Sequence, residues 1–159
     1  MKKLPVTQAT RFLRSAKAQY TDHLYDYEEK GGTAVSAREL GVPEHNVIKT
    51  LIFEDDKGRP LVVLMQGDMQ VSARGLARTI GARSTQVCLP EVAEKHSGYR
   101  VGGTSPFGLK IPLPIFAQTT IQQMDRLYIN GGARGYLVAL VPAELARLVS
   151  PTWVEVSRD

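Results

Sequence analysis

Apolar and polar positions follow two periods along this chain, one typical of helices and one typical of strands. Helical spacing, capping residues and glycine stops predict helices at residues 7–18, 33–40, 73–80, 90–97 and 142–149. Alternating or continuous apolar runs predict strands at residues 23–27, 47–53, 60–66, 85–89, 111–116, 126–129, 136–141 and 152–156. Because residues 111–116 contain two prolines, we expect an edge strand or an irregular strand there.

The order of these elements predicts the fold class. Helices and strands are interleaved, but several strand pairs are joined too tightly for parallel crossovers, and residues 55–59 fit a hairpin connection. We therefore predict an α+β fold with a small, mixed, mainly antiparallel, barrel-like sheet and helices packed outside it. Without repeats, low-complexity tracts or a linker, residues 1–159 are predicted to form a single domain.

Composition and charge narrow the class of protein. The hydrophobic content of 43% and the charged content of 23% are ordinary for a globular protein, and no apolar run reaches the length of a membrane span. The beginning of the chain has no apolar segment of signal-peptide length, and its single cysteine cannot form an internal disulfide. We therefore expect a cytoplasmic protein. The net charge of +4 is compatible with an RNA partner, although the arginines are scattered.

The cysteine and the three histidines show no metal-ligand spacing along the chain. Cys88 lies in an apolar segment and is predicted to be a core residue, with no histidine placed by sequence to activate its thiol. His23, His45 and His96 flank turns or helix ends and are predicted to be surface residues. We therefore expect no metal site, no cofactor and no thiol catalysis.

A lysine inside an apolar strand is the first candidate functional residue. In the predicted strand 47–53, alternation places Lys49 on the same face as Val47, Leu51 and Phe53. A lysine among apolar neighbours must be paired, desolvated or directed into a cavity. The pattern also fits an edge strand that uses lysine against aggregation, or a side chain that reaches out to water, and these are the more common uses.

The longest glycine-rich stretch is Gly-Tyr-Arg-Val-Gly-Gly-Thr-Ser-Pro-Phe-Gly at residues 98–108. Its bare backbone offers N–H groups to a carbonyl or phosphate oxygen on which negative charge develops. We predict that Gly102, Gly103, Thr104 and Ser105 form a wall of a binding pocket, although a connector between a helix and a strand has the same pattern. Ser105 is not predicted as a nucleophile, because its neighbours match neither the nucleophile elbow nor the P-loop.

A second stretch, Asn-Gly-Gly-Ala-Arg-Gly at residues 130–135, follows an apolar run. Asn-Gly is a strong hairpin signal, so a simple turn is one interpretation. The segment also has more glycine and charge than a turn requires. Arg134, held beside the exposed amides of Asn130, Gly131 and Gly132, could grip a phosphate or a terminal ribose. The pattern supports the two interpretations equally.

Taken together, these segments resemble the YbaK family of aminoacyl-tRNA deacylases, which are relatives of the editing domain of bacterial prolyl-tRNA synthetases. The resemblance rests on Tyr25, on Val-Ile-Lys-Thr-Leu-Ile at residues 47–52, and on residues 98–108 and 128–135. It covers nearly the whole chain. It implies the fold predicted above and the hydrolysis of a mischarged aminoacyl-tRNA, with Cys-tRNA(Pro) as the substrate of the YbaK branch.

The resemblance also implies roles for particular residues. Lys49 and Gly102 correspond to catalytic positions and Tyr25 to a pocket position, while Asn130 replaces the serine found in many members. In the implied mechanism the thiol of the substrate attacks its own ester, and Lys49 binds a phosphate or neutralises developing charge. The implied partners are the acceptor end of an aminoacyl-tRNA and prolyl-tRNA synthetase, with no membrane.

Two alternatives remain open. A deacylase for another residue, such as alanine on proline tRNA, would use water as the attacking group because its substrate has no thiol. A non-catalytic module that binds tRNA or a synthetase would bind without turnover.

Overall fold

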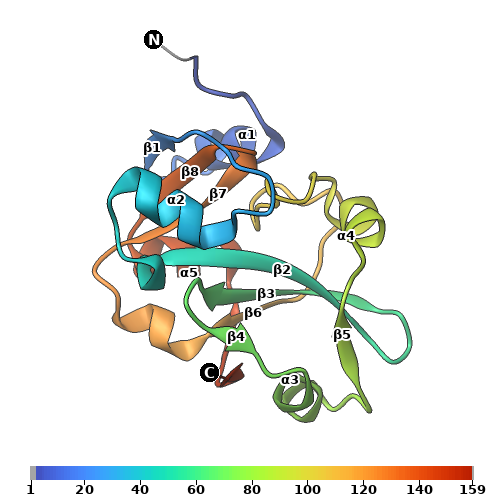
Figure 1. Ribbon diagram of the computed structural model, residues 1–159. Helices are drawn as coiled ribbons and strands as arrows, with labels where there is room; N and C mark the ends of the chain where they lie inside the picture. The colour runs from blue at the N-terminus through green and yellow to red at the C-terminus, as the bar shows by residue number, and fades with distance from the viewer. Residues whose placement is uncertain (1–2, 159) are drawn as a thin grey trace.

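The computed structural model describes residues 3–158 (Figure 1). The helices are α1 (Gln8–Ser15), α2 (Gly32–Leu40), α3 (Ala73–Ile80), α4 (Pro90–Ser97) and α5 (Pro142–Val149), with the 3₁₀ helices η1 (Glu44–Asn46) and η2 (Thr119–Gln123). The strands are β1 (Thr21–Leu24), β2 (Val47–Asp55), β3 (Pro60–Gln66), β4 (Gln70–Val71), β5 (Thr85–Val87), β6 (Ile115–Gln118), β7 (Leu127–Ala133), β8 (Tyr136–Leu140), β9 (Thr152–Val154) and β10 (Ser157–Arg158).

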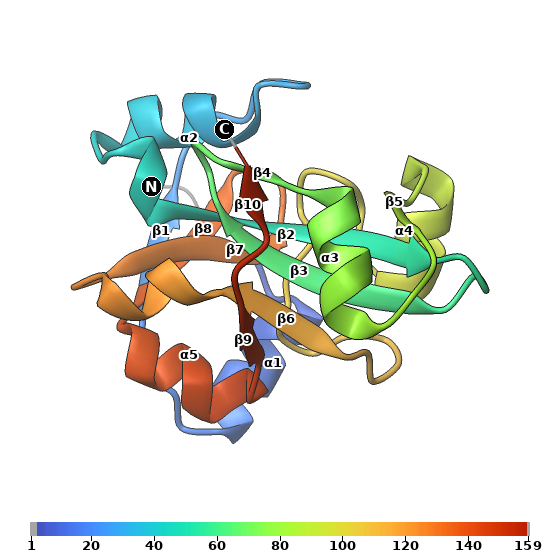
Figure 2. The same ribbon diagram turned by 90° about the horizontal axis from the view of Figure 1, so that it is seen from below.

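Most of the strands form one mixed sheet. Strands β1, β8, β7, β2, β3, β6 and β9 are neighbours in this order, and β5 pairs with the end of β2. The β1–β8, β7–β8, β2–β3 and β2–β5 pairs are antiparallel, whereas β2–β7, β3–β6 and β6–β9 are parallel. A separate antiparallel pair joins β4 to β10 (Figure 2). The predicted mixed, mainly antiparallel sheet with outer helices is confirmed.

Local sequence signals set several helix ends. The Thr7 hydroxyl accepts a hydrogen bond from the Thr10 N–H at 3.0 Å and caps α1, and Ser72 caps α3 in the same way. Gly41 and Gly81 end α2 and α3 in the left-handed conformation. These boundaries agree with the sequence predictions because each depends on residues adjacent in the chain.

Three predictions about strands are wrong. Strand β1 ends at Leu24, so Tyr25 follows the strand instead of lying inside it. Strand β6 begins after both prolines of residues 111–116 and pairs on both sides, with β3 and β9, so it is an interior strand. Residues 130–133 belong to β7, where the pairing with β8 is interrupted by an irregularity typical of a bulge.

Apolar side chains fill both faces of the sheet. The larger cluster lies on the face covered by α1, α4 and α5, where Leu13 and Phe107 are fully buried. A smaller cluster lies around Leu76 of α3, and a third cluster joins Ala37 of α2 to Val47 and Leu137. Successive residues of β2 face different clusters, since Ile52 belongs to the larger one and Phe53 to the one around Leu76. Strand β2 therefore runs through the middle of the molecule, with α2 above it and α3 below it in Figure 1.

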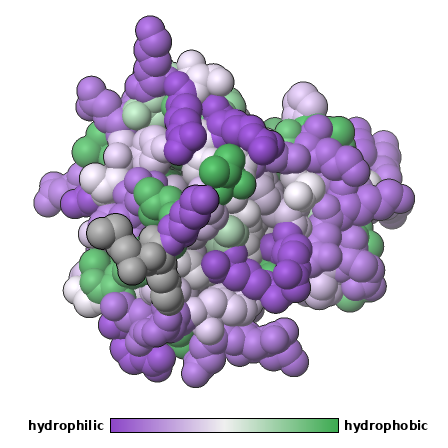
Figure 3. Space-filling view, turned by 90° about the horizontal axis from the view of Figure 1, so that it is seen from above, coloured by the Kyte–Doolittle hydropathy of each residue, from purple (hydrophilic) through white to green (hydrophobic). Residues whose placement is uncertain are grey.

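The helices within residues 3–158 are too short or too polar to cross a bilayer. The face shown in Figure 3 carries mainly hydrophilic side chains, and the coloured apolar residues on it form small separate groups. This face therefore presents no continuous apolar surface among the residues drawn in colour.

Candidate active site

The candidate site is built on an unpaired stretch of β2. On one side β2 pairs with β3 along most of its length. On the other side it pairs with β7 only at Val47 and Ile48, and with β5 only from Phe53 to Asp55. Residues 49–51 therefore have no ladder partner on that side, and the Ile52 carbonyl accepts a hydrogen bond from the Cys88 N–H at 2.9 Å. This gap in the sheet exposes part of the strand that contains Lys49.

A cleft of about 570 Å³ lies over the gap, between α2 and α4. Its floor is formed by residues 47–52 of β2. Its walls come from the segment around α2, the first turns of α4, residues 101, 102 and 104, and the loop between β7 and β8. The volume lies within the usual range for small-molecule sites, so the cleft can hold one small group together with part of its carrier.

Lys49 lines the cleft from β2 and is half-buried. Its Nζ donates a hydrogen bond to the Met69 carbonyl oxygen, in the turn between β3 and β4. Removal from water lowers the pKa of Lys49, and the carboxylates of Glu44 and Asp68 oppose that shift. Because the hydrogen-bond partner of Lys49 is an uncharged carbonyl oxygen, a phosphate or a developing negative charge in the cleft can compete for the ammonium.

Gly102 occupies a position that suits only glycine, and Gly103 occupies a position with little room for a side chain. Gly102 has a φ of +93°, and a Cβ added there would overlap the Tyr27 hydroxyl. A Cβ on Gly103 would lie 3.0 Å from the Ala133 carbonyl carbon, so the two glycine-rich stretches are in contact. The Gly103 N–H donates to the Arg100 carbonyl at 2.8 Å, whereas the Gly102 N–H has no acceptor within residues 3–158. Gly102 is therefore the member of the pair whose amide is free for a ligand.

Asn130 and Arg134 join the two glycine-rich stretches. The Asn130 Nδ2 donates to the Gly102 carbonyl at 3.1 Å, and its Oδ1 accepts from two N–H groups of its own loop at 2.6 and 3.1 Å. The Arg134 Nε donates to the Val101 carbonyl at 2.9 Å, and the guanidinium lies 5.1 Å from the centroid of the Tyr27 ring. Both side chains therefore fix the shape of the wall as well as lining the cleft.

The structure brings part of the predicted set together. The cleft-lining members are Tyr25, Lys49, Gly102, Thr104, Asn130 and Arg134. The others, which are Gly103, Ser105, Gly131 and Gly132, lie behind this lining. Ser105 is fully buried, and its Oγ accepts a hydrogen bond from the Phe107 N–H at 3.2 Å. Ser105 therefore supports the loop and does not reach the cleft.

Sequence reasoning missed two groups in the cleft. The Thr50 Oγ1 is buried and has no hydrogen-bond partner among the described residues, although Thr50 lines the cleft. A buried hydroxyl without a partner is unfavourable until a ligand pairs with it. The sequence signal that indicates Thr50 is its position as a second polar residue, next to Lys49, in an apolar strand. Tyr27 also lines the cleft and contacts both Gly102 and Arg134, but its neighbours in sequence do not indicate this.

The side chains described in the cleft include no activated nucleophile. Burial raises the pKa of Cys88 to about 11, so its thiol stays protonated at neutral pH. Burial also raises the pKa of Tyr25, which keeps its hydroxyl neutral. The described side chains of the cleft can therefore contribute binding, orientation and stabilisation of charge.

Replacement of Asn130 with alanine is expected to loosen both glycine-rich stretches. The variant leaves partly buried backbone groups without partners, so we expect the free energy of unfolding to fall by about 2 kcal/mol. Chemical denaturation measures the change. The control is Asn46→Ala, which removes a side-chain bond to the Arg126 carbonyl away from the loops. Equal losses in the two variants would argue against a special role for Asn130.

A cleft lined by a cation and a free backbone amide can bind a small group that carries negative charge. The family described as the aminoacyl-tRNA editing domain matches residues 28–148 of this chain. The chain belongs to this family, and the predicted resemblance to YbaK-type proteins is confirmed.

Individual relatives agree with this assignment. A protein of Enterococcus faecalis named "Putative Cys-tRNA(Pro)/Cys-tRNA(Cys) deacylase EbsC" is 26% identical over 152 residues, covering 95% of this chain and 93% of that protein. The proline–tRNA ligase of Geobacter metallireducens is 35% identical over 95 residues, which are 60% of this chain and 16% of the ligase. A crystal structure titled as "a putative trans-editing enzyme for prolyl tRNA synthetase" matches with a TM-score of 0.83 at 20% identity, covering 98% of this chain and 100% of that one. The predicted editing-domain fold is confirmed.

Proposed function

We propose that this protein is a trans-editing enzyme that releases a wrongly attached amino acid from tRNA, with Cys-tRNA(Pro) as its substrate. The observation that carries the proposal is a single cleft lined by both Lys49 and Gly102, whose N–H group is free. An aminoacyl ester is already an activated bond, so a cleft that orients it and stabilises charge is sufficient. The name of the Enterococcus faecalis relative supports cysteine as the amino acid.

In the proposed reaction the attacking group belongs to the substrate. Its thiol sulfur bonds to the carbonyl carbon of its own ester, the bond from that carbon to the ribose oxygen breaks, and the thiol proton passes to the departing oxygen. The tRNA leaves with a free hydroxyl, and water later opens the cyclic thioester. An attack within one molecule gains a large advantage from orientation, which the cleft provides by folding the aminoacyl group.

The residues of the cleft receive the following roles in this proposal. The Gly102 N–H donates to the carbonyl oxygen as negative charge develops on it. Lys49 binds the phosphate of the terminal adenosine or neutralises the same charge. Tyr25 and Thr104 form the walls around the aminoacyl group, and Arg134 faces the ribose and the phosphate. These roles are supported by the fact that all of these residues line the same cleft.

Comparison of three substrates tests this mechanism. We expect Cys-tRNA(Pro) to be cleaved fastest, and Ala-tRNA(Pro) and thiol-blocked Cys-tRNA(Pro) to be cleaved at least about tenfold more slowly, because both lack the internal nucleophile. The measurement is the release of labelled amino acid, with protein-free samples correcting for spontaneous hydrolysis. Equal rates on the blocked substrate would show that water attacks. Binding without turnover on any substrate would instead favour the non-catalytic module.

Prolyl-tRNA synthetase is the proposed partner. Proline–tRNA ligases are among the relatives of this chain, and the matched region forms only 16% of the Geobacter metallireducens ligase. The small cleft leaves the tRNA body to be selected by another protein. Repeating the substrate comparison with and without the synthetase tests the partnership, and an unchanged selectivity for proline tRNA would contradict it.

A further inference from the structure

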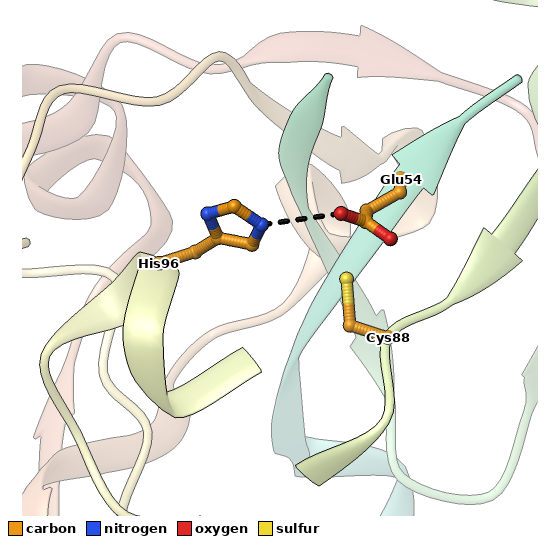
Figure 4. Close-up of side chains that lie close together, drawn as sticks. All are labelled: Glu54, Cys88 and His96. Atoms are coloured by element: carbon orange, nitrogen blue, oxygen red, sulfur yellow. Dashed lines mark hydrogen bonds and ion pairs between the residues drawn. The ribbon is translucent and has the colours of Figure 1, made fainter. Parts of the chain in front are cut away.

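Three side chains from separate elements meet beside the cleft: Glu54 near the end of β2, Cys88 just after β5, and His96 in the last turn of α4 (Figure 4). A carboxylate oxygen, the thiol sulfur and a ring nitrogen from these residues all lie within 4.8 Å of one another. The His96 Nε2 lies 3.2 Å from the Glu54 Oε2. The prediction of His96 as a surface residue is wrong, because its side chain is only 20% exposed.

We propose that Glu54, Cys88 and His96 bind one zinc ion. Thiolate, imidazole and carboxylate are the ligands that zinc uses in proteins, and three protein ligands leave a fourth position open. Donor atoms around a tetrahedral zinc stand about 3.5 Å apart, so small side-chain movements are enough to close the site. Sequence spacing gave no sign of it, because the ligands come from three different elements.

The surroundings suit a bound cation. Cys88 is buried, while Glu54 and His96 are each 20% exposed, and Cys88 and the neighbouring part of α4 line the cleft, which provides a path of entry. On binding, a bond forms between zinc and the Cys88 sulfur, and the thiol proton goes to solvent. The negative thiolate and the negative Glu54 carboxylate then balance the two positive charges of the ion, and neutral His96 completes the set. No net charge is buried.

The Glu54 end of the site lies away from Lys49 along β2. A strand rises about 3.3 Å per residue, so the five positions from Lys49 to Glu54 correspond to about 16 Å. The ion would instead tie α4 to β2 and to the segment after β5. The Glu94 Oε2 of α4 accepts a hydrogen bond from the Val101 N–H at 3.0 Å, so the position of α4 affects the wall that contains Gly102. We therefore infer that the metal holds this wall in place.

Titration of the metal-free protein with zinc chloride tests the inference directly. We expect one ion per chain by calorimetry and a higher unfolding temperature in the loaded protein. Titration with cobalt(II) should produce the near-ultraviolet absorption of a thiolate–cobalt bond, and Cys88 is the only cysteine in the chain. One ion per two chains, or cobalt binding without that absorption, would overturn the proposal.

Variants assign the ligands. Cys88→Ser and His96→Gln are each expected to weaken zinc binding at least about tenfold, since each removes a direct ligand. The control is His45→Gln, which removes an exposed histidine paired with Asp68 and should leave zinc binding unchanged. Equal effects at His45 and His96 would refute the site. If a ligand variant does not fold, the cobalt spectrum of the unaltered protein decides the matter.

Discussion

Replacement of Lys49 with alanine is expected to lower the rate of deacylation by about 100-fold or more and to leave the fold intact. The variant removes the cation that lines the cleft from β2, so the phosphate or the developing oxyanion loses its compensating charge. The loss of stability is small, because the ammonium donates to a single backbone carbonyl, that of Met69. Its partial burial also disfavours the charged form. Single-turnover deacylation and thermal unfolding of the same samples measure the two effects.

Two further lysine variants sharpen the Lys49 experiment. Lys49→Met keeps the length of the side chain and removes only the charge, so it should lose activity as alanine does. Lys57→Ala removes an exposed lysine from the β2–β3 hairpin and should retain full activity. If Lys49 binds phosphate, its removal should raise KM. If it stabilises the oxyanion, its removal should lower kcat. An unchanged rate in Lys49→Ala would eliminate the central role of this residue.

Replacement of Gly102 with alanine is expected to reduce deacylation about as strongly and to destabilise the protein by about 2 kcal/mol. The φ of +93° disfavours any residue with a Cβ, and the added carbon would overlap the Tyr27 hydroxyl. The backbone must then move, which displaces the free N–H group that we assign to the oxyanion. Deacylation assays and chemical denaturation measure the two losses.

A second glycine separates strain from function in this experiment. Gly58 lies in the β2–β3 hairpin with a φ of +74°, and a Cβ there would meet nothing within 4 Å. Gly58→Ala should therefore lose about 1 kcal/mol of stability and keep its activity. The double variant Gly102→Ala with Tyr27→Phe removes the overlapping hydroxyl and should recover part of the stability. Full activity in Gly102→Ala would contradict the proposed oxyanion site.

Much of the fold could be predicted because its signals are local. The hydroxyls of Thr7 and Ser72 cap the helices that follow them, and Gly41 ends α2, as their positions in the sequence indicate. The sequence left the Asn130 loop undecided, because a hairpin and a binding loop share one pattern. In the structure the antiparallel strands β7 and β8 flank this loop, an irregular part of β7 carries it, and the Asn130 side chain holds it to Gly102.

The sequence by itself determined the five helices, most of the strands, the mixed sheet and the candidate segments, because periodicity, capping and glycine content act between residues close in the chain. Only the tertiary structure decided which candidates share a cleft. The gap in β2 depends on how far β5 and β7 extend along it, and the wall around Gly102 depends on the contact of Gly103 with Ala133 of the other glycine-rich stretch. The meeting of Glu54, Cys88 and His96 likewise depends on the packing of α4 and the segment after β5 against β2. Such contacts join residues far apart in sequence, and no local pattern encodes them.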